Sequence, residues 1–166
     1  MTDCSLPYVI DSEGRYRFKR KVKSEQILQI AASILEAQFS CGDLVKNPTD
    51  TKRYLTFQLG GLEHESFCCL FLSTRHRILR FEQIFTGTID GCAVYPREVV
   101  KRALQCNAAA VIFAHNHPSG VSEPSHADEL LTRRLKEALA LVDIRVLDHI
   151  IVAGTEAVSL AERGIL

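Results

Sequence analysis

The chain has 166 residues, 46% of them hydrophobic, and its 20 basic and 20 acidic side chains give a formal net charge of zero. This length fits one domain with a substantial core, and the charge balance provides no overall electrostatic attraction to nucleic acid. Because no apolar run approaches the length of a membrane helix and the amino terminus lacks the basic-then-apolar order of a signal peptide, we expect a cytoplasmic protein with no membrane partner.

The cysteines are scattered and form no C-x-x-C pair; they are Cys4, Cys41, Cys68, Cys69, Cys92 and Cys106. Cys68 and Cys69 fall inside an apolar run. This pattern favours reduced, buried thiols over disulfides or a cysteine-rich zinc site.

Residues 1–23 show no hydrophobic periodicity, and we interpret them as a basic N-terminal arm that precedes a domain at 24–166. Tyr16 and Phe18 interleave there with the basic residues Arg15, Arg17, Lys19, Arg20, Lys21 and Lys23. Alternating basic and aromatic side chains can contact the phosphates and bases of DNA. A run of like charge is more often a solvated edge strand or an exposed arm, and we favour that interpretation.

Hydrophobic spacing predicts a helix, a loop and three strands in the first half of the domain. Ser24 suits the start of a helix that ends near Phe39, because apolar residues recur at helical spacing at Ile27, Ile30, Ala31, Ile34 and Leu35. Residues 41–52 favour a loop. Strands are predicted at 54–59, 66–73 and 77–85, and the turns between them indicate an antiparallel meander.

The second half predicts helices and strands in mixed order. The expected elements are a short strand at 93–95, a helix from Pro96 to Cys106, a strand at 109–114, a helix opened by Ser125, and a strand at 144–152. Residues 155–166 are too few for a prediction. Because helices and strands do not alternate strictly, we predict an α+β fold with one mixed sheet flanked by helices.

Two histidines follow the buried strand predicted before residue 115. Residues two apart in an extended chain point to the same side, so His115 and His117 can present both imidazoles to one point. A seven-residue loop with Pro118, Gly120 and Pro124 then leads to Ser125, and Asp128 lies in the first turn of the following helix. Two nitrogens and one oxygen form a three-ligand set that leaves a position for water, as catalytic zinc sites do.

The same residues have a simpler interpretation. Ser125 and Asp128 form an S-x-x-D pattern, typical of a capping box, in which Asp128 would only satisfy an amide at the helix start. A His-x-His pair alone is also a weak signal. The combination of a histidine pair at a strand end, a Pro/Gly loop and a carboxylate at a helix start favours the metal site.

These residues resemble the JAMM motif of the JAB/MPN metalloprotease superfamily, and His115, His117, Ser125 and Asp128 match it position by position. The segments 107–110, 114–120, 147–151 and 87–90 with 96–98 resemble its RadC-type branch. The resemblance covers residues 24–166 and implies a JAB/MPN domain with cytidine-deaminase-like architecture. Full-length RadC-type proteins carry an N-terminal helix-hairpin-helix region, for which there is no room before Ser24, so we expect a short stand-alone form.

The resemblance also implies roles for two further side chains. The serine of the motif, Ser125, would donate a hydrogen bond to the oxyanion, besides capping its helix. A general-base glutamate stands upstream in the family, at the start of a strand, and Glu65 holds that position. Glu63 and Glu82 are the alternatives, and each of the three can equally be a solvated strand-end carboxylate.

Other titratable residues receive no ligand role. Asp148 and His149 face opposite ways on one strand, so at most one points at the metal, and we expect it to have a structural role beside the ligands. The remaining histidines, His64, His76 and His126, are expected at the surface.

Three functions follow from these features. The leading prediction is a zinc-dependent hydrolase of the JAMM type that cleaves a peptide or isopeptide bond of a protein or peptide substrate through a metal-bound water. An alternative is a DNA-repair or recombination-associated accessory protein of the RadC type, with no proteolytic role, which only the basic arm supports. A third is an inactive binding module that keeps the fold and the metal.

Overall fold

The computed structural model describes residues 7–13, 15–38, 41–45, 47–89 and 91–166, with the backbone alone for residues 35–38. Contacts divide the chain into two compact units, Met1–Ala37 and Gln38–Leu166. The domain boundary expected from the sequence, between residues 23 and 24, stays a prediction, and the helix that follows it falls in the first unit. Within the described residues, no helix combines the length and the apolar character of a membrane span.

The first unit contains a short hairpin and one helix. Strands β1 (Tyr8–Ile10) and β2 (Tyr16–Phe18) pair in antiparallel register, and helix α1 spans Ser24–Gln38. The predicted helix is therefore confirmed, although its expected end near Phe39 lies outside the described residues. Ile27 of its apolar stripe remains 45% exposed.

The second unit is a five-stranded sheet between helices, with the strand order β4-β3-β5-β6-β7. Neighbouring strands are antiparallel except for β5 and β6, which are parallel. Its strands are β3 (Ser66–Leu72), β4 (Ile78–Thr86), β5 (Ala110–Asn116), β6 (Arg145–Ala153) and β7 (Glu156–Ser159), and its helices are α2 (Pro48–Leu59), α3 (Pro96–Gln105) and α4 (His126–Ala140). The predicted α+β fold with a mixed sheet and flanking helices is confirmed.

Helix α2 corrects the strand predicted at 54–59. Asn47 caps this helix, since its side-chain oxygen accepts a hydrogen bond from the amide of Asp50, and Pro48 occupies the first turn. The buried residues Thr51, Tyr54, Leu55 and Leu59 share one helical face. The predicted three-stranded meander is therefore the two-stranded β3–β4 hairpin, and part of the loop expected at 41–52 is helical.

The short strand predicted at 93–95 is also wrong, because these residues form no strand in the structure. They lead directly into α3, whose first residue is Pro96, as expected. The central strand, the helix after Ser125 and the strand near 144–152 are confirmed as β5, α4 and β6. The carboxyl-terminal stretch, for which no element was predicted, forms β7.

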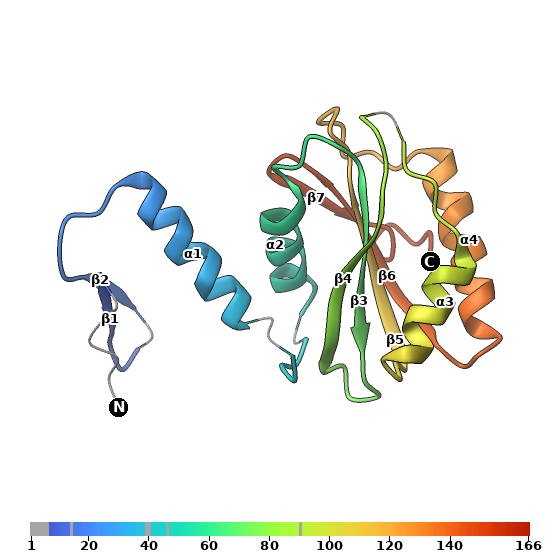
Figure 1. Cartoon of the computed structure of the whole chain (residues 1–166), viewed down its shortest axis with the longest axis horizontal. Helices are drawn as coiled ribbons and strands as arrows, with labels where there is room; N and C mark the ends of the chain where they lie inside the picture. Colours follow the sequence, from blue (N-terminus) through green and yellow to red (C-terminus); the bar gives the residue numbers. More distant parts are fainter. Residues whose placement is uncertain (1–6, 14, 39–40, 46, 90) are drawn as a thin grey trace. The chain divides into compact units, whose positions relative to one another are not determined.

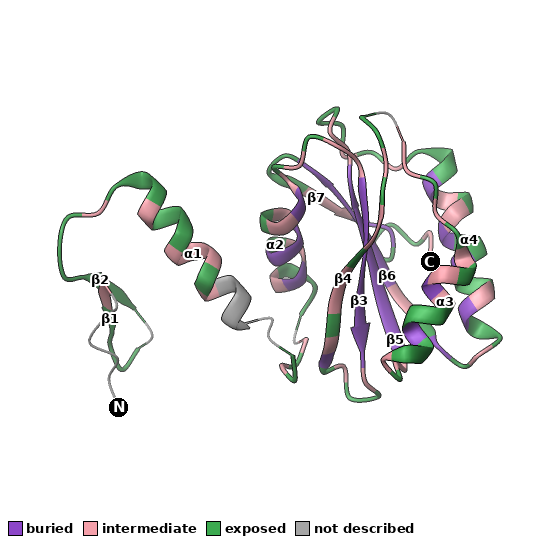
Figure 2. Ribbon diagram, viewed as in Figure 1, coloured by how far each residue is buried: buried purple, intermediate pink, exposed green. Residues whose placement is uncertain are grey.

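Helices cover both faces of the sheet: α2 lies on one side, and α3 and α4 lie on the other (Figure 1). All seven residues of β3 and all seven of β5 are buried, as the purple centre of the sheet in Figure 2 shows. A core cluster that includes Phe67, Phe71 and Phe113 joins the sheet to α3 and α4. Since alternate strand residues share a face, His115 at the end of β5 lies on the same side as Phe113 and faces α4.

Candidate metal centre

The imidazole rings of His115 and His117, at the carboxyl end of β5 and just beyond it, point to one place. His115 lies within the strand and is 1% exposed, whereas His117 lies one residue beyond the strand end. Their Nε2 atoms are 2.9 Å apart. The expectation that both imidazoles face the same point is met.

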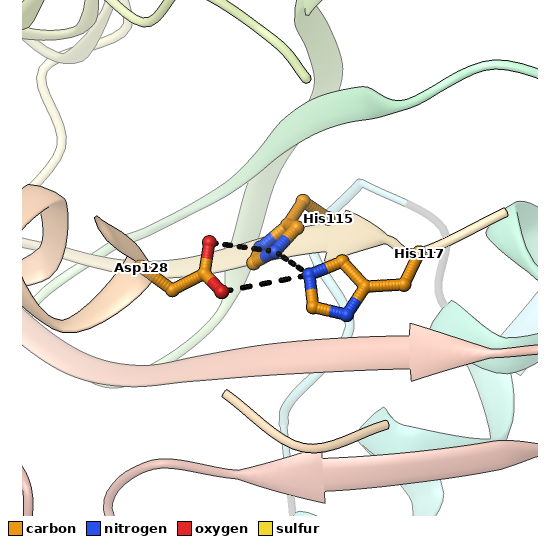
Figure 3. Close-up of side chains that lie close together, drawn as sticks. All are labelled: His115, His117 and Asp128. Carbon is orange, nitrogen blue, oxygen red and sulfur yellow. Dashed lines mark hydrogen bonds and ion pairs between the residues drawn. The ribbon is translucent and has the colours of Figure 1, made fainter. Parts of the chain in front are cut away.

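Asp128 completes the group from the first turn of α4, as Figure 3 shows. Its Oδ1 lies 3.2 Å from His115 Nε2, and its Oδ2 lies 3.5 Å from His117 Nε2. In the described part of the chain, these three side chains form the only cluster of histidine, cysteine and acidic residues whose ligand atoms could hold a metal ion.

Asp128 also takes part in a capping box. Ser125 Oγ accepts a hydrogen bond from the Asp128 amide at 3.1 Å and donates one to Asp128 Oδ2 at 2.6 Å. The Ser125 amide donates to the same Oδ2 at 2.8 Å. The capping box is therefore present, and it uses Oδ2 of the carboxylate while Oδ1 faces His115.

The spacing of the three side chains fits a tetrahedral ion. Zinc with nitrogen and oxygen ligands at about 2.0–2.1 Å keeps its ligand atoms about 3.3 Å apart. The two Nε2 atoms are 2.9 Å apart, and they lie 3.2 and 3.5 Å from different oxygens of Asp128. With one ligand atom from each residue, the three atoms lie within 4.8 Å of one another, which is close enough for the group to hold a metal ion.

A backbone carbonyl sets the proton position of His117. Its Nδ1 lies 2.7 Å from the carbonyl oxygen of Val121 in the loop that follows. A carbonyl oxygen can only accept a hydrogen bond, so Nδ1 carries the proton. In the neutral ring the lone pair is then on Nε2, the atom that faces His115 and Asp128.

Mutual contacts shift the pKa values at the site. Burial acts to raise the pKa of Asp128, but its contacts with the rings of His115 and His117 outweigh this and hold that pKa well below its ordinary value. The hydrogen bond with Asp128 raises the pKa of His117 above its ordinary value. Asp128 is therefore a carboxylate at neutral pH and adds negative charge to the two imidazoles, which favours a divalent cation.

A cavity of about 440 Å³ opens beside this group. His117, Ser125, Asp128 and Glu65 line it, together with apolar side chains that include Ile89, Val94 and Leu131. Glu65 precedes β3, and its backbone is held by hydrogen bonds to Gly87 and Thr88. The structure thus brings Glu65 to the same cavity as the candidate ligands.

The two alternative glutamates are absent from the lining of this cavity. Glu63 is exposed on the turn before β3. Glu82 lies within β4 and forms ion pairs with Arg80 and Arg102. Of the three glutamates, Glu65 is the one that lines the cavity.

Asp148 and His149 face opposite sides of β6, as expected. Asp148 accepts hydrogen bonds from Ser159 Oγ and from the amide of Ala161, away from the histidine pair. His149 is fully buried, and its Nε2 lies 2.8 Å from His115 Nδ1. Burial lowers the pKa of His149 well below its ordinary value, because it disfavours the charged ring.

Asn116 is a residue of this site that sequence reasoning missed. It is 2% exposed, and its Oδ1 accepts a hydrogen bond from the amide of Ser66 at 2.8 Å. Its Nδ2 donates to the carbonyl oxygens of His64, at 3.0 Å, and Leu62, at 3.4 Å. Asn116 therefore holds the segment that carries Glu65 against the strand that carries the histidines.

The basic N-terminal segment belongs to the other unit of the chain. Arg15 forms ion pairs with Asp11 and Glu13, so part of its charge is neutralised locally. Arg17 lies on β2 and is exposed. Near it, the rings of Tyr8 and Tyr16 contact each other at 5.2 Å between centroids.

Comparison with protein families matches residues 45–165 to the RadC-like JAB domain. Relatives named UPF0758 protein are similar over most of the chain. One from Nitrosococcus oceani is 61% identical over 139 residues, and one from Marinobacter nauticus is 58% identical over 139 residues; each alignment covers 84% of this chain and 62% of the relative. One from Vibrio cholerae is 53% identical over 150 residues, which are 90% of this chain and 94% of the relative.

Proposed function

The chain belongs to the family of RadC-like JAB domains, and on this basis we propose that it is a zinc-dependent hydrolase that cleaves a peptide or isopeptide bond. One observation carries the proposal: His115, His117 and Asp128 converge beside a cavity that Glu65 and Ser125 also line. The chain spans 62% of the length of the first relatives it matches, so the activity of the whole proteins is part of the same proposal.

The donor set supports zinc as the metal. Two imidazole nitrogens and one carboxylate oxygen are a ligand set of catalytic zinc sites, which keep a fourth position open. Zinc held by His115, His117 and Asp128 would supply an acidified water molecule and would polarise a substrate carbonyl. The protein side chains then have to bind the substrate, move one proton and stabilise charge.

Glu65 is proposed as the general base and acid. Its carboxylate would accept the proton that water loses as oxygen bonds to the carbonyl carbon. It would return this proton to the amine nitrogen as the carbon–nitrogen bond breaks, so that no net proton is gained or lost. The backbone hydrogen bonds of Glu65 to Gly87 and Thr88 hold it at the cavity wall.

Ser125 is proposed to donate a hydrogen bond to the oxyanion. In the structure its hydroxyl proton lies on the hydrogen bond to Asp128 Oδ2. Donation to a substrate oxygen therefore requires this proton to turn away from Asp128 toward the cavity. The Ser125 amide also donates to Oδ2 and would keep Asp128 in place.

Metal analysis followed by a matched pair of variants tests the proposal. We expect the purified protein to bind one zinc ion, and zinc-loaded protein to cleave members of a peptide library in a mass-spectrometric digest. Glu65→Gln should keep the zinc and lose cleavage by a factor of at least about 100, the usual scale for a general base. Glu63→Gln, at the exposed site outside the cavity, is the control and should retain cleavage.

Two results would contradict the proposal. A wild-type protein that binds no zinc on titration would exclude the metal centre. Zinc binding without cleavage would favour the inactive binding module. Equal cleavage by Glu65→Gln and wild type would exclude Glu65 as the general base.

The DNA-associated alternative requires a different measurement. It rests on the exposed basic and aromatic residues of the first unit, including Arg17 and Tyr16. Salt-dependent DNA binding that disappears when these basic residues are neutralised would support it. Absence of binding at low salt would exclude it, whatever the metal content.

A further inference from the structure

A chain of three buried hydrogen bonds runs behind the candidate metal ligands. His115 Nδ1 lies 2.8 Å from His149 Nε2, and His149 Nδ1 lies 2.6 Å from Thr132 Oγ1. Thr132 Oγ1 lies 2.6 Å from the backbone carbonyl oxygen of Asp128. None of the three side chains is more than 1% exposed, so water does not compete for these bonds.

The Asp128 carbonyl determines the direction of every bond in this chain. A carbonyl oxygen can only accept, so the single hydroxyl proton of Thr132 is donated to it. The Thr132 oxygen must then accept the hydrogen bond from His149, so the proton lies on His149 Nδ1. The His149 ring is fully buried and bonds to Thr132 and His115, and a second proton on it would be a buried charge with no acidic hydrogen-bond partner. Its Nε2 therefore has a lone pair and accepts a proton from His115 Nδ1.

The opposite direction fails at the end of the chain. Thr132 would then donate its only proton to His149 Nδ1. Its oxygen would face the Asp128 carbonyl oxygen at 2.6 Å with no hydrogen between them. Two acceptor oxygens this close, with no proton between them, repel each other.

We infer that Thr132 and His149 are positioning residues that hold His115 in the form protonated at Nδ1, which leaves its Nε2 lone pair free to bind the metal ion. The inference rests on the proposed metal centre and extends it to two residues that do not touch the ion. It also explains why the chain of bonds begins at one ligand, His115, and ends on the backbone of another, Asp128.

Ring packing fixes His149 for this role. Phe67 and Phe113 contact its imidazole edge to face, with centroids 5.6 and 5.7 Å away. The ring therefore cannot turn to exchange its two nitrogens without moving the core between β5 and α4. His117 is set differently, because its Nδ1 proton goes directly to a backbone carbonyl.

Substitutions of equal shape separate hydrogen bonding from packing. Thr132→Val keeps the volume and removes the hydroxyl, so His149 Nδ1 loses its acceptor. The proton of His149 then moves to Nε2, where it can be donated to His115 Nδ1. The proton of His115 must then lie on Nε2, the nitrogen that faces the metal site. Thr132→Ser keeps the hydroxyl and is the matched control. His149→Phe and His149→Gln form a second pair, in which only glutamine offers an oxygen to His115.

Zinc affinity is measured by competition with a chromogenic chelator, after urea unfolding shows that each variant is folded. We expect Thr132→Val and His149→Phe to bind zinc about 10–100-fold more weakly, the usual effect of removing a group that orients a metal ligand. Thr132→Ser and His149→Gln should recover most of this loss. Equal affinity of Thr132→Val and Thr132→Ser would overturn the inference.

Nitrogen NMR of the imidazoles reads the proton positions directly. In ¹⁵N-labelled, zinc-loaded protein we expect a protonated Nδ1 and an unprotonated Nε2 on His149. A proton on His149 Nε2 would refute the direction of the chain. If the wild-type protein binds no zinc, the proposed function fails and the inference fails with it. If the wild type binds zinc and all four variants bind equally well, only the inference fails.

Discussion

Replacing Asn116 with alanine should loosen the segment that carries Glu65. The Asn116 side chain accepts a hydrogen bond from the Ser66 amide at 2.8 Å and donates one to the His64 carbonyl at 3.0 Å. Ser66 is fully buried, so water cannot replace the lost acceptor. The change therefore removes the side chain that fastens the start of β3 to the end of β5.

The size of the effect follows from these contacts. A buried amide left without an acceptor costs about 1–3 kcal/mol, and the bond to the His64 carbonyl contributes about 0.5–1.5 kcal/mol. We expect Asn116→Ala to lower the free energy of unfolding by about 2–4 kcal/mol. This is a large part of the 5–15 kcal/mol that is typical of a folded domain.

Urea unfolding measures the loss, and amide hydrogen exchange locates it. Exchange should accelerate most at Ser66 and its neighbour Glu65. Asn116→Leu is the control, because leucine fills the space without replacing the hydrogen bonds. A loss below about 1 kcal/mol, or full stability of Asn116→Leu, would show that the hydrogen bonds are not the cause.

Three further predictions concern pH, capping and thiols. The hydrogen bond with Asp128 raises the pKa of His117 above 6.5, so a proton competes with zinc at His117 as the pH falls through that raised pKa. The affinity for zinc should then fall about tenfold per pH unit below it. A competition titration in which the zinc affinity does not change with pH would contradict this. Ser125→Ala should lower unfolding stability by about 1 kcal/mol in urea, and an unchanged midpoint would exclude the capping role. Burial raises the pKa of Cys68 to about 12 and that of Cys69 well above its ordinary value. Both thiols should therefore react with a disulfide reagent only after the protein unfolds, and mass spectrometry of the peptide that contains them tests this.

The candidate ligands were predictable because they are local in sequence. His115 and His117 follow a strand that its apolar residues identify, and Asp128 follows a Pro/Gly loop and a serine cap. Each signal lies within about a dozen residues of the next. The RadC-type resemblance then agreed with the family comparison over residues 45–165.

Helix α2 was missed because a short apolar window does not distinguish strand from helix. Residues 54–59 alternate well enough for a strand, but the decisive signal lies upstream at Asn47 and Pro48, which cap and open the helix. Reading this pair as a helix start would have corrected the prediction.

Asn116 and Thr132 could not be assigned from sequence, for a different reason. Their partners lie far along the chain: Ser66 is 50 residues from Asn116, and His149 is 17 residues from Thr132. Only the pairing of β3 with β5, and the packing of α4 on β6, brings them together. Such contacts depend on the register of the sheet, which no local pattern contains.

The divided carboxylate of Asp128 couples ion capture to the integrity of a helix end. Oδ2 secures the first turn of α4, and Oδ1 faces His115. Fraying of that turn would remove one ligand. An ion present at a free concentration of about 100 times its dissociation constant would raise the free energy of unfolding by about 2.7 kcal/mol. Removing the ion with a chelator should therefore lower the melting temperature of the whole second unit. Mutations on the solvent side of α4 that destabilise its first turn should weaken binding of the ion without touching it.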